Sequence, residues 1–119
     1  MTDIEEIVEF QKKFDMSHGW TDEFDGKDAK FFERLQYATI ALAGEVGEYS
    51  NFLKKIIREK NLTDEINEEH TSAMKEELVD IFIYLVILSI ILKVDIAKTY
   101  YEKMKFNQQR FQKFEKTDY

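Results

Sequence analysis

Hydrophobic residues recur every three to four positions along most of the chain, which is the period of an amphipathic α-helix. This pattern predicts four helices, separated by more polar segments. They run from about Asp3 to Met16, from near Asp28 to about Lys60, from about Ser72 to Lys93, and from after Asp95 to near Lys113. Short connections between four helices are typical of an all-α fold of the four-helix-bundle type.

Capping residues support these limits. Thr2 is the expected N-cap of the first helix, and Asp28 and Asp95 are the expected N-caps of the second and fourth. The second helix is long for a globular protein, so a kink or break within it is an open alternative. The polar stretch NLTDEINEEHTS is expected to be a loop, with room for a short helical turn after Thr63. The first helix has a clear apolar face, formed by Ile4, Ile7, Val8, Phe10 and Phe14.

The third predicted helix is apolar on nearly every side from Ile81 to Leu92. Such a helix has to be buried all round. Three other helices offer little material to surround it, so we expect a second subunit, in a homodimer or homotetramer. The alternative is a monomer whose core covers this helix completely.

Composition limits the classes of protein that fit. A chain of 119 residues suits one domain, 1–119, and 44% hydrophobic residues favour an ordered core. The absence of cysteine excludes disulfides and thiolate metal sites. A net charge of −7 argues against general nucleic-acid binding. The start of the chain lacks a signal-peptide pattern, and the apolar run is too short for a bilayer, so a cytoplasmic protein without membrane contact is expected.

Two pairs of acidic residues interrupt apolar segments. Glu45 and Glu48 lie three positions apart in the second helix, and Glu77 and Asp80 repeat this spacing in the third. Residues at i and i+3 share a helix face, so antiparallel packing would bring all four carboxylates to one point. Oxygen-only ligands suit Mg²⁺, or alternatively Mn²⁺. The competing interpretation is four solvent-facing acids; a di-iron site is disfavoured because it needs Glu-x-x-His pairs.

Gly44 and Gly47 flank Glu45 within a helix, where each glycine costs up to about 1 kcal/mol relative to alanine. Two explanations are open. The glycines either admit a ligand or another backbone, or they allow a tight helix crossing.

The fourth helix carries Lys103, Asn107 and Arg110 on one face, with Tyr100 and Phe114 extending the stripe. Lysine and arginine bind phosphate oxygens well. The stripe is therefore either a phosphate clamp beside the carboxylates or an ordinary solvated surface.

The stretches GEVGE, EELVDIFIYLV and K-x-x-x-N-x-x-R together resemble the MazG-like, all-α nucleoside triphosphate pyrophosphohydrolases, over about residues 30 to 111. The resemblance implies an oligomeric helical bundle with Mg²⁺ held by Glu45, Glu48, Glu77 and Asp80. It implies hydrolysis of (d)NTPs to (d)NMPs and pyrophosphate, with nucleotide-pool cleansing as one role. Glu45 or Glu48 would activate the water. The implied nucleotide contacts are Lys103, Asn107 and Arg110 for the triphosphate and Tyr84 for the sugar or base.

Two further positions, Lys55 and Trp20, are candidate nucleotide contacts. Several relatives carry tryptophan where this chain has Lys55, which falls on the Glu48 face and is a further candidate phosphate contact. Trp20 is either a stacking platform for a base or a buried structural residue. The alternative function is a non-catalytic helical module. It either binds a nucleotide, or binds a protein through its apolar third helix.

Overall fold

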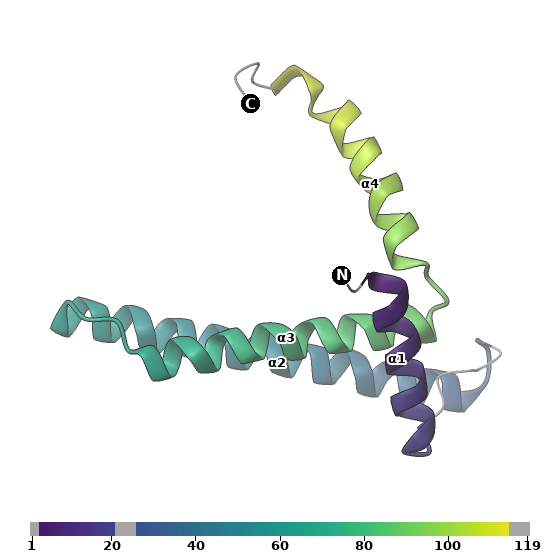
Figure 1. The fold of residues 1–119 in the computed structure, drawn as a ribbon, viewed down its shortest axis with the longest axis horizontal. Coiled ribbons are helices and arrows are strands. Elements are labelled where there is room, and N and C mark those ends of the chain that lie inside the picture. The colour runs from purple at the N-terminus through teal and green to yellow at the C-terminus, as the bar shows by residue number, and fades with distance from the viewer. Residues whose placement is uncertain (1–2, 21–25, 115–119) are drawn as a thin grey trace.

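The computed structural model describes residues 3–20 and 26–114, and all regular structure in these ranges is helical (Figure 1). The all-α prediction is therefore confirmed. The elements are α1 (Ile4–Ser17), α2 (Ala29–Thr63), α3 (Glu68–Ile91), α4 (Ile96–Arg110) and a short 3-10 turn, η1 (Gln112–Phe114). None of the described helices carries an apolar stretch long enough to cross a membrane.

Side-chain caps start each helix. Asp28 Oδ1 accepts a hydrogen bond from the Phe31 N–H at 2.8 Å, and Asp95 Oδ1 accepts one from the Lys98 N–H at 3.1 Å, as predicted. The N-cap of α1 is Asp3, whose carboxylate accepts from the Glu6 N–H at 2.9 Å. The prediction that Thr2 is this N-cap was therefore wrong. Thr2 itself lies outside the described residues.

The centre of the fold is an antiparallel hairpin of α2 and α3 (Figure 1). The predicted antiparallel packing is confirmed, and α2 runs unbroken for 35 residues. The expected loop between them is reduced to residues 64–67, because Asp64 turns the chain with a φ of 59° and Asn67 caps α3 at once. A buried cluster holds the hairpin together near its open end; its members are Phe31, Ala38, Ile87 and Ile91.

The other two helices sit at one end of this hairpin. α1 crosses α3, and α4 packs against α1 and η1 while pointing away from the hairpin (Figure 1). Among the described residues, α4 has no comparable packing against α2 or α3, and none of its own residues is buried. The predicted four-helix bundle is therefore wrong for a single chain, because only α2 and α3 pair their apolar faces along their length.

This open shape leaves much apolar surface uncovered. The radius of gyration is 18.6 Å, whereas a compact chain of this length has about 13–14 Å. The accessible surface is 9702 Å², against roughly 6,800 Å² expected for a monomer of this mass. On α3, Leu78 and Leu85 are 56% and 42% exposed. The expectation that α3 is buried on every side is thus not met within one chain.

Candidate metal centre and its two cavities

Three carboxylates meet in the middle of the hairpin. Glu45 and Glu48 project from α2 and Glu77 projects from α3, and one oxygen from each lies within 4.8 Å of the others. The i, i+3 spacing on α2 places its two acids on one face, and the antiparallel pairing sets the third opposite them. The predicted convergence is confirmed for these three residues.

The cluster is electrostatically costly without a cation. The pKa of Glu77 is raised from 4.5 to about 7. The largest cause is a hydrogen bond that the protonated carboxyl makes with Glu45, followed by burial and then by a hydrogen bond with Glu48. One oxygen of Glu45 and one of Glu77 are buried without a hydrogen-bond partner among the described residues. Ionised carboxylates cannot donate hydrogen bonds to one another. A divalent cation would satisfy these oxygens, and an all-oxygen donor set fits Mg²⁺ or Mn²⁺.

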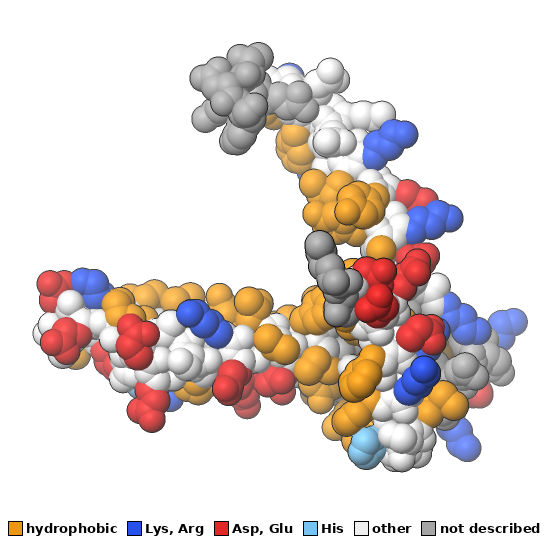
Figure 2. Space-filling model, in the orientation of Figure 1, with side chains coloured by type: hydrophobic (Ala, Val, Ile, Leu, Met, Phe, Trp, Pro, Cys, Tyr) orange, Lys and Arg blue, Asp and Glu red, His pale blue; other side chains and the backbone are white. Residues whose placement is uncertain are grey.

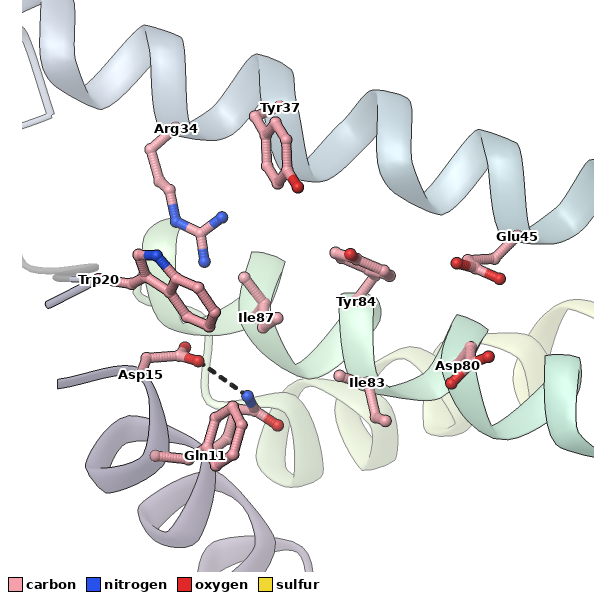
Figure 3. Close-up of a pocket in the computed structure, with 11 residues that line it drawn as sticks. Gln11, Asp15, Trp20, Arg34, Tyr37, Glu45, Asp80, Ile83, Tyr84 and Ile87 are labelled. Atoms are coloured by element: carbon pink, nitrogen blue, oxygen red, sulfur yellow. Dashed lines mark hydrogen bonds between the residues drawn. The ribbon is translucent and has the colours of Figure 1, made fainter. Parts of the chain in front are cut away.

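Asp80 does not belong to this close group. It lies three residues after Glu77 on α3, and its side chain is one methylene shorter than that of a glutamate, so it reaches less far toward α2. Its carboxylate lines the end of a cavity together with Glu45 (Figure 3). The prediction that all four acids converge on one point is corrected to three, with Asp80 beside them.

The raised pKa of Glu77 predicts a pH-dependent stability of the cation-free protein. A group whose folded pKa of about 7 exceeds its usual 4.5 stabilises the fold fully at low pH and loses that contribution as pH rises through 7. We expect the urea midpoint to fall between pH 5 and pH 8 in EDTA. Glu77→Gln should flatten this change, and an equal decline in that variant would contradict the assignment.

A cavity of about 490 Å³ lies between the end of α1 and the hairpin. Trp20, Arg34, Tyr37 and Tyr84 surround it at one end and in the middle, and the acids lie at the other end (Figure 3). The pKa of the Tyr84 phenol is raised, first by burial and then by the neighbouring Tyr37. Tyr84 shares this cavity with Glu45 and Asp80, and its expected contact with a sugar or base stays a prediction.

Trp20 is 52% exposed and lines this cavity. Its ring stacks on His18, with the ring centroids 5.2 Å apart. The interpretation of Trp20 as a buried structural residue was therefore wrong. The alternative interpretation as a platform for a flat ligand stays a prediction, and the residue is placed where it could act in that way.

Sequence reasoning missed four residues that line the cavity: Gln11, Asp15, Arg34 and Tyr37. Arg34 and Tyr37 precede Glu45 by 11 and 8 positions. Positions i, i+8 and i+11 lie on one broad face of a helix, so the helical period was a usable signal. Gln11 and Asp15 gave no such signal, because α1 reaches the site only through its crossing of α3.

A second cavity, of about 280 Å³, lies beyond the acids. Glu48 and Glu77 form one side, and Asn51, Phe52 and Lys55 complete it. The ammonium of Lys55 lies 5.4 Å from the centre of the Phe52 ring. Lys55 and Glu48 therefore share a face, as predicted, and a cationic side chain stands next to the carboxylate cluster.

The basic residues of α4 are not brought to this site within one chain. Their side chains lie over aromatic rings that are near in sequence. Lys103 Nζ is 5.5 Å from the centre of the Phe106 ring, and Arg110 Cζ is 4.3 Å from the centre of the Phe111 ring. The Asn107 amide faces the Met104 sulfur at 3.9 Å. Because α4 ends at Arg110, the predicted stripe does not continue to Phe114, which lies in η1. A phosphate-binding role for α4 stays a prediction and requires another chain.

Gly44 and Gly47 do not mark a tight helix crossing in this chain. A Cβ atom added at either position would meet nothing within 4 Å among the described residues. The surface beside Glu45 is therefore open to an approaching ligand or subunit, which favours the first of the two explanations.

Comparison with protein-family models found no match. Among curated proteins, the chain is 38% identical over 58 residues to the Gene 37 protein of Mycobacterium phage L5. The match covers 49% of this chain and 49% of the phage protein, so the chain spans about half the length of that relative. This partial similarity does not establish a family.

Proposed function

We propose that the protein is a Mg²⁺-dependent nucleoside triphosphate pyrophosphohydrolase of the MazG-like kind. It would hydrolyse a (d)NTP with one water to a (d)NMP and pyrophosphate. The observation that carries the proposal is the acid cluster itself. One buried oxygen each of Glu45 and Glu77 has no donor in the part of the chain that the structure describes, and the cluster lies between an aromatic cavity and a cavity with a lysine. A nucleotide needs these same three environments for its base, its metal-bound phosphates and its terminal phosphates.

The residues divide this task by position. Glu45, Glu48 and Glu77 would hold Mg²⁺, with Asp80 beside them, and the cation would supply charge neutralisation and acidify the attacking water. Glu45 or Glu48 would orient that water or accept its proton. Phosphoryl transfer depends chiefly on positioning and charge neutralisation, so no covalent nucleophile is required.

The flanking cavities would hold the two ends of the substrate. Lys55 would neutralise phosphate oxygens on one side of the acids. Tyr84 and Trp20 would contact the sugar and base on the other side. This order places the α–β phosphoanhydride bond next to the carboxylates.

We also propose that the working unit is a homodimer, or a tetramer built from dimers. Hydrophobic side chains gather on the inner side of the bend between the hairpin and α4 (Figure 2). The surface in excess of a compact monomer is about 2,900 Å², which exceeds the roughly 1,000 Å² or more per partner buried in an obligate dimer. In such a dimer, α4 could bring Lys103, Asn107 and Arg110 to the other subunit's acids.

A second candidate is a non-catalytic module that binds a nucleotide or a protein. The extent of exposed apolar surface favours it, because partner-binding proteins show such patches. A module that binds only a protein predicts no change in melting temperature with Mg²⁺, whereas the enzyme predicts a rise with Mg²⁺ plus nucleotide. A module that binds a nucleotide without hydrolysing it predicts the same rise, and turnover measurements separate it from the enzyme.

A nucleotide panel tests the proposed activity. The protein is incubated with each NTP and dNTP in Mg²⁺, and pyrophosphate is measured separately from orthophosphate. We expect equal amounts of pyrophosphate and nucleoside monophosphate, and neither in EDTA. Release of orthophosphate alone, or no release from any nucleotide, would overturn the proposal.

A further inference from the structure

The second cavity contains a cation that has no anionic partner in the part of the chain that the structure describes. Lys55 is half-buried there, and the carboxylates of Glu48 and Glu77 line the same cavity. Neither carboxylate forms an ion pair with the ammonium, which lies instead 5.4 Å from the centre of the Phe52 ring. A ring face attracts a cation but does not neutralise its charge. The ammonium therefore keeps its three N–H donors for an anion that enters the cavity.

The Phe52 ring under this ammonium is fixed by contacts across the hairpin. Phe52 and Lys55 lie three positions apart on one face of α2. From α3, the His70 ring packs against Phe52 with the ring centroids 6.0 Å apart, and His70 Nδ1 lies 3.0 Å from Glu59 Oε1 of α2. Asn51 adds an amide donor to the same cavity. The cavity therefore presents donors on one side and carboxylates on the other.

Charge and spacing define the anion that suits this cavity. Three carboxylates exceed the two positive charges of one Mg²⁺, so a phosphate bound at the acid cluster needs a further cation nearby. Lys55 follows Glu48 by seven residues, which is roughly 10.5 Å along the helix axis. Long side chains of a helix lean toward its N-terminus, and in α2 this direction leads from Lys55 toward the acids. An anion with two linked phosphates suits this spacing better than a single phosphate does.

We propose that the second cavity retains pyrophosphate, which is therefore the last product to leave and an inhibitor that competes with the nucleotide. The inference rests on the proposed function in taking pyrophosphate as a product. Pyrophosphate carries more negative charge than a nucleoside monophosphate, so the Lys55 ammonium and the cation-loaded acids hold it more strongly. The monophosphate has no group that reaches Lys55 once the phosphoanhydride bond is broken, and it leaves first.

Thermal melts of the full chain test the site without any need for catalysis. The ligands are Mg²⁺ alone, Mg²⁺ with orthophosphate and Mg²⁺ with pyrophosphate, with Mg²⁺ in excess because pyrophosphate itself binds the cation. We expect pyrophosphate to raise the melting temperature further than orthophosphate does, with a dissociation constant at least about tenfold lower. Equal effects of the two anions, or no effect of pyrophosphate beyond that of Mg²⁺, would overturn the proposal.

The variant Lys55→Gln tests the residue itself, because it removes the charge and keeps a good helix former. We expect pyrophosphate binding to weaken by about tenfold or more, while the effect of Mg²⁺ alone is unchanged. Lys55→Arg keeps the charge and should keep most of the binding. Lys54→Gln is the matched control, since Lys54 is the exposed neighbour on the same helix and the net charge changes equally. Equal weakening in Lys54→Gln and Lys55→Gln would show a general charge effect and would overturn the site. Should Lys55→Gln not fold, the comparison of the two anions on the wild type still decides.

Product inhibition tests the order of release. With a nucleotide that the protein hydrolyses, pyrophosphate should inhibit competitively and the nucleoside monophosphate non-competitively. Competitive inhibition by the monophosphate, or no inhibition by pyrophosphate, would overturn the proposed order.

The two proposals fail in different ways. Binding of pyrophosphate without hydrolysis of any nucleotide would support the anion site and overturn the hydrolase. Hydrolysis with no preference for pyrophosphate over orthophosphate would support the hydrolase and overturn the retention of pyrophosphate.

Discussion

Glu77→Gln is expected to lower pyrophosphate release by at least about 100-fold, because even outer-shell partners of a metal site are worth 10–100-fold. Glu77 is the α3 contribution to a group otherwise supplied by α2. A neutral amide is a poor ligand for Mg²⁺ and leaves the other two acids less able to hold the cation. The helical circular dichroism spectrum should be unchanged, since Gln has nearly the same shape and helix propensity.

Thermal melts separate loss of metal from loss of fold. Mg²⁺ should raise the melting temperature of the wild type and leave that of Glu77→Gln unmoved, because only a ligand of the native state stabilises it. Glu76→Gln is the matched control, since Glu76 is the exposed neighbour on the same helix and lies outside the acid group. Full activity in Glu77→Gln, or equal loss in both variants, would show that the site is misplaced.

The second large effect concerns assembly. Leu85 lies between the pairing face of α3 and solvent, 42% exposed, while its neighbours Val86 and Ile87 are buried. Light scattering of the wild type should give the mass of two or four chains at micromolar concentration. Leu85→Glu should weaken association by about 10–70-fold or more, since the 42% of the leucine left exposed is worth about 0.6–1.3 kcal/mol when buried and counts twice across a two-fold axis.

Leu62→Glu is the control for that change. Leu62 is 79% exposed near the tip of the hairpin, where the same substitution alters charge equally. We expect this variant to keep the wild-type mass. A wild type that is monomeric at 100 µM would contradict the dimer and would favour a different protein as the partner of the apolar surface.

Much of the helical structure could be predicted from the sequence because its signals are local. The apolar period of α2 and α3 and the caps at Asp28 and Asp95 depend on neighbours within about one turn. The meeting of Glu45, Glu48 and Glu77 needed only two spacings and one antiparallel turn. Asp80 was misplaced because spacing along a helix gives the face of a residue but not how far its side chain reaches toward the partner helix.

The rest depends on packing between distant segments, which periodicity does not encode. The stripe of Lys103, Asn107 and Arg110 could be recognised on α4, but its direction is set by a few contacts with α1. The cavity that Asp15 and Trp20 line exists only because α1 crosses the end of α3. The unbroken α2 confirms the predicted helix from near Asp28 to about Lys60, as a sequence without proline favours, and the alternative of a break was wrong.

Because α2 is unbroken, it sets the spacing between the residues of the candidate site. This one helix carries residues of both cavities and of the acid cluster. They are Arg34 and Tyr37 of the aromatic cavity, Glu45 and Glu48 of the cluster, and Lys55 of the second cavity. Adding one residue anywhere between Tyr37 and Lys55 would rotate everything beyond it by about 100° and shift it by about 1.5 Å. Length variation in this chain is therefore tolerable in the turn at 64–67, whereas an insertion within α2 would change how the two cavities face the acid cluster.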